Sequence, residues 1–255
     1  MRMTLLHRLA PIALTALVSL ASPQLATAQA PAAQARAADF GGVWTSVTPP
    51  GTGGPWAIDT FSAKLPALTA WGQAKFDAAK PQRGPRGVAV SETDDLVYQC
   101  FPPGVPRIYL HPFPFEIVQT PGRVLMVFEY DHLVRQIFMD GRGHRDDLPP
   151  SWMGDSTAKW ENGTLVVETV GFNDRTWIDR IAVPHSEDMR VIERMHLNAN
   201  GYLQIDMRVE DPKALVQAWE FTRYFKKTDW TIDELICKDN ANFDDFESTV
   251  TGFKK

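Results

Sequence analysis

Cysteine, long apolar runs and excess positive charge are all scarce in this chain, and each scarcity excludes a class of protein. Two cysteines in 255 residues are too few for a disulfide-dense scaffold or a cysteine-based zinc ribbon. The formal charge is −5, so no basic field exists to attract DNA, RNA or an anionic membrane. Past the first residues, no stretch approaches the roughly 18 apolar residues that would span a membrane. We therefore expect neither a nucleic-acid partner nor a membrane span in the mature chain.

The sequence motifs of several large enzyme classes are also absent. There is no Gly-x-Ser-x-Gly, no Gly-x-Gly-x-x-Gly and no phosphate-binding P-loop. The histidines show neither His-x-x-x-His nor His-x-His spacing, which metal-binding helices and strands use. We expect no cofactor and no metal site.

The first residues have the pattern of an export signal. Arg2 and Arg8 give a basic start, and Leu9–Leu20 is mostly Ala, Leu, Ile and Val. Ala26-Thr27-Ala28 fits the small-x-small pattern of a cleavage site. We predict a signal peptide over residues 1–28 and a periplasmic or secreted mature protein.

Export changes what the two cysteines mean. In an oxidising compartment Cys100 and Cys237 are expected to pair, because two thiols there usually form a disulfide. The alternative is two separate buried thiols.

The rest of the chain predicts one β-rich domain. Residues 29–39 are of low complexity and predict a flexible linker, so the domain is expected to cover 40–255. One short helix is expected near 69–80, and from Arg107 onward short runs rich in Val, Ile, Phe, Tyr and Thr alternate with turn residues. The first of these runs is Arg107–His111 and the last is Trp230–Cys237. About ten strands predict an antiparallel barrel or sandwich.

Several strands carry a charge in an otherwise apolar row. Alternation puts Glu193 in line with Val191 and Met195, and it puts Arg135 and Arg223 among apolar and aromatic side chains. A buried charge is costly unless it is paired, so these groups should pair or line a wet cavity. A barrel interior with a few polar groups on apolar walls is a common form of small-molecule site.

Long runs of the chain resemble an uncharacterised family of exported bacterial proteins. The runs are Pro114–Val124 (PFEIVQTPGRV), Leu165–Trp177 (LVVETVGFNDRTW) and Pro184–Glu187 (PHSE). The resemblance implies export and a β fold, and it brings no reaction with it.

A second, shorter resemblance is to lipocalins and other calycin-like barrels. It rests on Gly42-Val43-Trp44, which is similar to the Gly-x-Trp motif of their first strand. In those families the Trp closes one end of the barrel and packs beneath a basic residue from the last strands. Arg223 is the matching candidate here.

The candidate acid/base residues lie in and after the irregular segment that follows Val170. His185 titrates near neutral pH, and Glu193 could orient it or act itself. Arg135 and Arg223 could hold an anionic or carbonyl oxygen. Loop residues that could contact a ligand are Trp152, Asn173 and Trp177. A structural hydrogen-bond cluster is the competing interpretation.

Three functions stay open at this point. The first is an exported barrel that binds a small apolar or aromatic molecule in a partly polar cavity. The second is a cofactor-free acid/base enzyme, an isomerase, lyase or hydrolase, that uses His185 and Glu193 on the same barrel. The third is an interaction module of the cell envelope. The first two predict that Arg135, His185, Glu193 and Arg223 converge on one cavity.

Overall fold

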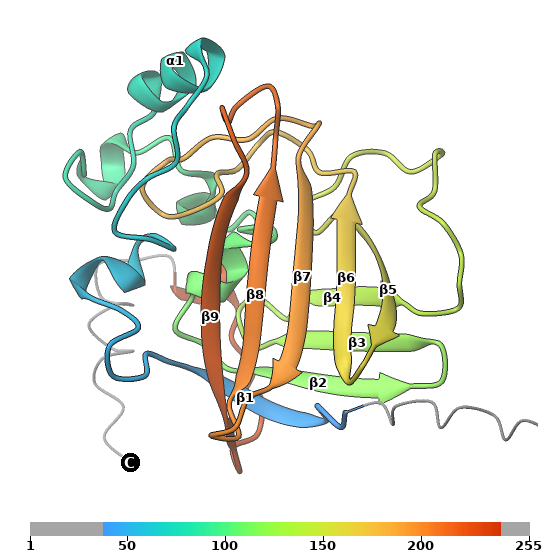
Figure 1. Ribbon diagram of the computed structural model, residues 1–255. Helices are drawn as coiled ribbons and strands as arrows, with labels where there is room; N and C mark the ends of the chain where they lie inside the picture. Colours follow the sequence, from blue (N-terminus) through green and yellow to red (C-terminus); the bar gives the residue numbers. More distant parts are fainter. Residues whose placement is uncertain (1–37, 241–255) are drawn as a thin grey trace, which may run out of the picture. The chain divides into compact units, whose positions relative to one another are not determined.

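Nine strands close into a single barrel in the computed structural model, which describes residues 38–240 (Figure 1). This confirms the predicted mainly-β barrel and excludes the sandwich. The strands are β1 (Gly42–Val47), β2 (Phe115–Thr120), β3 (Arg123–Phe128), β4 (Val134–Phe138), β5 (Asp155–Glu161), β6 (Thr164–Val170), β7 (Arg190–Leu197), β8 (Leu203–Glu210) and β9 (Trp219–Thr228).

The strands pair in chain order, and β9 returns to β1 to close the barrel. Every junction is antiparallel except β4–β5, a short parallel contact in which Ile137 pairs with Ser156 and Phe138 with Thr157. In Figure 1 the strands β6–β9 stand upright across β1–β3, as strong twisting of a closed sheet requires.

The side-chain alternation expected from the sequence is present. On β8 the side chains of Leu203, Ile205, Met207 and Val209 are buried, while those between them are partly or fully exposed. The buried rows of the nine strands, together with aromatic side chains from the connecting segments, form one apolar core. The barrel interior is therefore largely filled.

Two Asn-Gly pairs connect neighbouring strands, and they differ in conformation. Asn162 and Gly163 both have positive φ, 50° and 81°, as a tight type I′ turn between β5 and β6 requires. At the second turn Gly201 has φ 76°, but Asn200 does not have positive φ. There the loop is longer. The Asn198 N–H donates to the Tyr202 carbonyl, and the Gly201 N–H donates to the Asn198 carbonyl.

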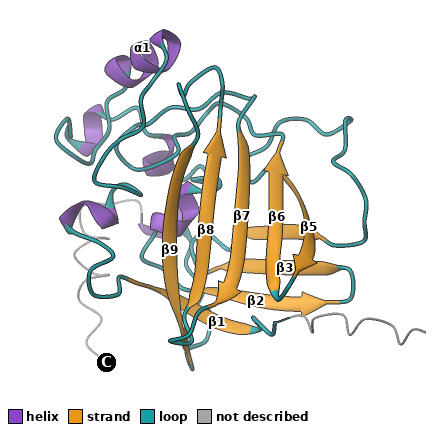
Figure 2. Cartoon of the chain, viewed as in Figure 1, coloured by secondary structure: helices purple, strands orange, loops and turns teal. Residues whose placement is uncertain are grey.

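Most of the described helical structure lies in the long segment between β1 and β2. Figure 2 shows the helices gathered beside β9, away from β5 and β6. The α-helix α1 (Ala70–Ala78) is close to the predicted position and begins at Thr69, whose hydroxyl accepts from the Gly72 N–H at 3.0 Å. The short 3-10 helices are η1 (Pro55–Ile58), η2 (Val90–Glu92), η3 (Leu96–Gln99), η4 (Arg107–Leu110) and η5 (Cys237–Asn240).

Two predicted strands are wrong. Residues 107–111 are the 3-10 helix η4 and its C-cap, and all four helical side chains are buried, so alternation could not identify them. Residues 230–236 are irregular apart from one bridge between Leu235 and Tyr130, and Cys237 begins the 3-10 helix η5. A short apolar run is consistent with either a strand or a buried helix, and here packing against the barrel decides.

The predicted disulfide between Cys100 and Cys237 is confirmed, with a Cα–Cα distance of 5.5 Å. It ties the segment after η3 to the chain after β9, which are 137 residues apart in the sequence. The Tyr130 hydroxyl lies 3.6 Å from the Cys237 sulfur.

The predicted signal peptide, and most of the predicted linker, lie outside the described residues. Within residues 38–240, no helix has the length and apolar character needed to cross a membrane.

Candidate functional site

The Arg135 and Glu193 side chains form an ion pair in the barrel interior. They come from β4 and β7, and they are 1% and 0% exposed. Arg135 Nη1 donates to Glu193 Oε1 at 2.9 Å, and Nη2 donates to Oε2. The two charges that interrupt the apolar rows of β4 and β7 are therefore paired with each other.

Three hydroxyl groups complete this buried cluster. The Tyr109 hydroxyl, from η4, donates to Glu193 Oε1 at 2.8 Å and accepts from Arg135 Nη1 at 2.7 Å. Arg135 also donates to Ser156 and Thr169. Burial and the charge of Glu193 raise the pKa of Tyr109 well above its usual value. Because every N–H of the guanidinium has an acceptor, the cluster is complete without a ligand.

A separate pocket of about 430 Å³ lies where the β1–β2 segment meets the end of β1, Arg223 of β9 and Tyr130, which follows β3. Its size is in the range of small-molecule sites. Apolar and hydroxyl-bearing side chains form much of its wall, and they include Val47, Ile58, Val97, Tyr98, Phe113 and Tyr130. Ile58 is 58% exposed, so an apolar side chain marks the rim of the pocket.

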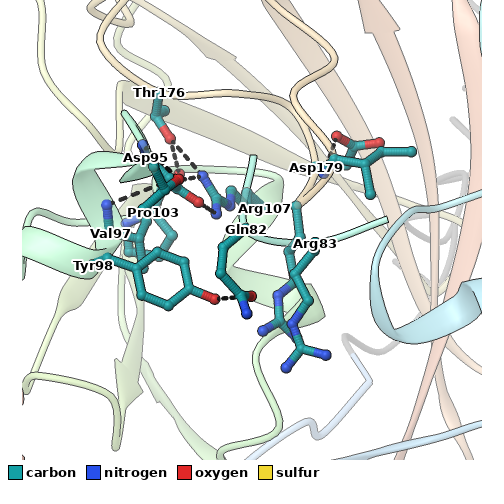
Figure 3. Close-up of polar contacts among 12 residues, drawn as sticks. Gln82, Arg83, Asp95, Val97, Tyr98, Pro103, Arg107, Thr176 and Asp179 are labelled. Atoms are coloured by element: carbon teal, nitrogen blue, oxygen red, sulfur yellow. Dashed lines mark hydrogen bonds and ion pairs between the residues drawn. The ribbon is translucent and has the colours of Figure 1, made fainter. Parts of the chain in front are cut away.

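The charged side chains of the pocket wall are all basic. They are Arg83, Arg107, Arg180 and Arg223, with His111 beside them, and no Asp or Glu is among the residues that line this pocket. The acids that balance two of these arginines lie behind the wall. Arg107 is bonded through both Nη atoms to Asp95 (Figure 3). The Nε of Arg83 lies 3.8 Å from Asp59.

The Arg107–Asp95 ion pair is itself buried, with exposures of 2% and 3%. Burial opposes the charge of Arg107, but Asp95 outweighs this effect and raises the pKa of the guanidinium. Asp95 also accepts from the Val97 N–H, so the pair fixes the start of η3 in the pocket wall.

The His111 imidazole shows that the pocket is electropositive. Burial, and then the charges of Arg180, Arg107 and Arg83, lower its pKa well below 6.5. The ring lies against Tyr130, with 4.7 Å between centroids, and its buried Nε2 has no hydrogen-bond partner. His111 is therefore neutral at pH 7 and has an unused polar atom.

Arg223 has few hydrogen-bond partners and no acidic partner in the pocket wall. It lies on the buried face of β9 between Phe221 and Phe225, with 9% exposure. Nη1 donates to the Ala57 carbonyl and Nη2 to the Ser46 hydroxyl, each at 3.0 Å, and the buried Nε has no partner. Burial lowers the pKa of Arg223 to about 10.

The predicted site residues do not converge on one cavity. Arg135 pairs with Glu193 in the interior, and of the four residues expected to converge only Arg223 lines the pocket described above. His185 is 2% exposed, its Nδ1 lies 3.1 Å from the Ser186 carbonyl, and its ring contacts Phe172. Burial lowers the pKa of His185. The acid/base hypothesis for His185 and Glu193 stays a prediction.

The three predicted loop residues lie outside the pocket wall. Trp152 stacks on Phe101 with ring centroids 5.6 Å apart, and Arg175 lies 5.0 Å from both rings. The side-chain Oδ1 of Asn173 accepts a hydrogen bond from the Arg175 backbone N–H at 3.1 Å. Trp177 packs near Arg107, whose guanidinium carbon is 5.4 Å from its ring centroid.

The basic residue that faces Trp44 is Lys227. Its Nζ is 5.9 Å from the Trp44 ring centroid, and the two residues are partners in the β1–β9 register. The resemblance to lipocalins assigned this role to Arg223, whose bonds instead reach Ala57 and Ser46.

Sequence reasoning missed most of the pocket wall. Arg83 lies between the predicted helix and the first predicted strand, and Arg107 and His111 lie in the segment that was predicted to be that strand. The Pro102-Pro103-Gly104-Val105-Pro106 stretch was the available signal, because it predicts irregular backbone, where binding residues collect.

Comparisons of the chain with family models, curated proteins and solved structures found no match. The resemblance to exported bacterial proteins and to lipocalins stays a prediction.

Proposed function

We propose that the protein binds one small molecule with an apolar or aromatic body in the pocket between β1, β9 and the β1–β2 segment. The observation that carries the proposal is a cavity of about 430 Å³ lined by Tyr98, Phe113 and Tyr130 as well as by basic groups. Small-molecule sites combine apolar walls with a few polar groups in this way. The site is at the edge of the barrel core and not in its filled interior.

The proposed setting is the periplasm or the extracellular medium. The Cys100–Cys237 disulfide supports it, because structural disulfides persist in oxidising compartments. The export signal predicted over residues 1–28 supports the same setting.

A substitution that fills the pocket tests this function. Val47 is half-buried at the end of β1 and lines the cavity, so Val47→Phe puts a ring into it. The neutral aromatic probe naphthamide should bind the unmodified protein in isothermal titration calorimetry and bind Val47→Phe at least about 10-fold more weakly, a loss of about 1.4 kcal/mol.

The matched control is Val118→Phe on β2, where the side chain is 37% exposed and outside the pocket. It should leave naphthamide affinity unchanged. Failure of the unmodified protein to bind the probe, or equal weakening by both variants, would contradict the proposed function.

A further inference from the structure

Arg223 has hydrogen-bond donors that the described protein does not use. A guanidinium has five N–H groups, and Arg135 in the barrel interior uses all of them. Arg223 has two bonds, both to uncharged acceptors, and its buried Nε has none. Unsatisfied buried donors are costly, so a guanidinium with unused N–H groups in a pocket wall points to a partner outside the chain.

The charge of Arg223 is also uncompensated. Asp95 neutralises Arg107, and Asp59 lies near Arg83. Within residues 38–240 no ion pair joins Arg223 to a carboxylate, and burial lowers its pKa without an opposing acidic group. A negatively charged group of a ligand in the pocket would therefore supply the counter-charge that Arg223 lacks.

We infer that the ligand is a small monocarboxylate with an apolar body, and that its carboxylate binds the Arg223 guanidinium. The inference rests on the proposed function and names the chemical class of the molecule bound there. A planar carboxylate can accept two parallel N–H bonds from one edge of a guanidinium. At Arg223 each Nη carries a second N–H beyond the one that bonds Ala57 or Ser46, and these can donate to a carboxylate.

The surroundings of Arg223 favour a carboxylate over a phosphate group. The apolar wall formed by Val47, Val97, Leu110 and Phe113 needs an apolar partner, which inorganic phosphate lacks. His111 is neutral, so it adds no further charge to the pocket wall.

A pair of probes that differ in charge alone tests the inference. Naphthoate and naphthamide have the same ring system and nearly the same shape. Calorimetry on the full-length protein should show naphthoate binding about 10- to 100-fold more tightly, the ratio expected for charge-assisted hydrogen bonds. Inorganic phosphate at the same concentration should not displace naphthoate.

Arg223→Met should abolish the preference for naphthoate and leave the naphthamide affinity within about 3-fold, because its main effect is to remove one charge–charge contact. Arg208→Met is the matched control, since Arg208 lies on the exposed face of β8 and bonds Glu210 and Glu220. It should keep the full preference. Arg223→Gln is a second variant, which is uncharged but retains an amide donor for the Ala57 carbonyl.

The outcomes separate the inference from the proposed function. Equal affinity for both probes would overturn the carboxylate and leave the pocket as a neutral small-molecule site. Binding of neither probe would overturn both. A preference that survives in Arg223→Met and Arg223→Gln would remove Arg223 from the site. If neither variant folds, Arg223 is a structural group and the inference is wrong.

Discussion

Arg135 of β4 and Glu193 of β7 face each other inside the barrel, almost fully shielded from water, and each satisfies the charge of the other. Burial alone would lower the pKa of Arg135, but Glu193 and Tyr109 outweigh it and raise the pKa above its usual value. The Tyr109 hydroxyl bonds both members of the pair, so the pair also holds η4 against the barrel.

Glu193→Gln should therefore destabilise the fold strongly. It leaves the Arg135 cation buried without a counter-ion, which costs about 3–5 kcal/mol of unfolding free energy. Urea denaturation followed by tryptophan fluorescence measures the loss. Glu220→Gln, which breaks an exposed pair with Arg208, should cost no more than about 1 kcal/mol. A loss below about 1 kcal/mol for Glu193→Gln would mean that the buried pair does not stabilise the barrel.

The strand alternation predicted that both residues of this pair would need a partner. Glu193 and Arg135 each interrupt an apolar row with period two, and an interior charge needs a partner. The identity of the partner was not predictable, because β5 and β6 lie between β4 and β7 in the barrel. Tyr109 was missed as well, since it enters from a 3-10 helix that the sequence presents as a β-prone run.

The pocket was less predictable for a related reason. Apart from Arg223 on β9, its wall comes mostly from η1, η3, η4, the loops before β7 and after β3, and the end of β1. Those pieces are short and irregular, and they have no sequence periodicity to identify their buried faces. Arg223 was found because it lies on a regular strand, and Arg83, Arg107 and Arg180 were missed because they do not.

Removing the disulfide should lower stability by a large amount. In the chain-entropy model, a bridge that closes so long a loop contributes about 4–5 kcal/mol. Cys100→Ala with Cys237→Ala, compared with the oxidised protein in denaturant unfolding, should show a loss of this order. Titration of thiols in the unfolded, unreduced protein is the direct check, and finding two free thiols would contradict the bond.

His111 should make the fold sensitive to acid. Its pKa is well below 6.5 in the folded protein, so below pH 6.5 the unfolded chain binds a proton that the folded chain does not. Stability therefore falls as the pH decreases from 6.5, by at most about 1.4 kcal/mol per pH unit for one group. His185 acts in the same direction, while Asp179, whose pKa burial raises to about 6, acts in the opposite direction.

His111→Phe keeps a ring against Tyr130 and removes the titrating group. Its stability, measured by urea unfolding at pH values from 7 down to about 5, should fall less steeply than that of the unmodified protein. His196→Phe on the half-exposed part of β7 is the control. Parallel curves for His111→Phe and the unmodified protein would contradict the assignment.

His185 allows a test of the acid/base hypothesis. The side chain is 2% exposed and contacts Phe172, so packing predicts that His185→Ala opens a cavity and costs about 2–4 kcal/mol. Thermal unfolding measures this. An unchanged melting temperature would contradict the packing argument and favour a role for His185 in chemistry.

A crystal structure of the protein with naphthoate tests the central claim most directly. It should show the naphthyl ring in the pocket beside Phe113 and Tyr130, with carboxylate oxygens about 2.7–2.9 Å from the Nη atoms of Arg223. Naphthoate bound elsewhere on the barrel, or bound in the pocket with its carboxylate turned away from Arg223, would contradict the account.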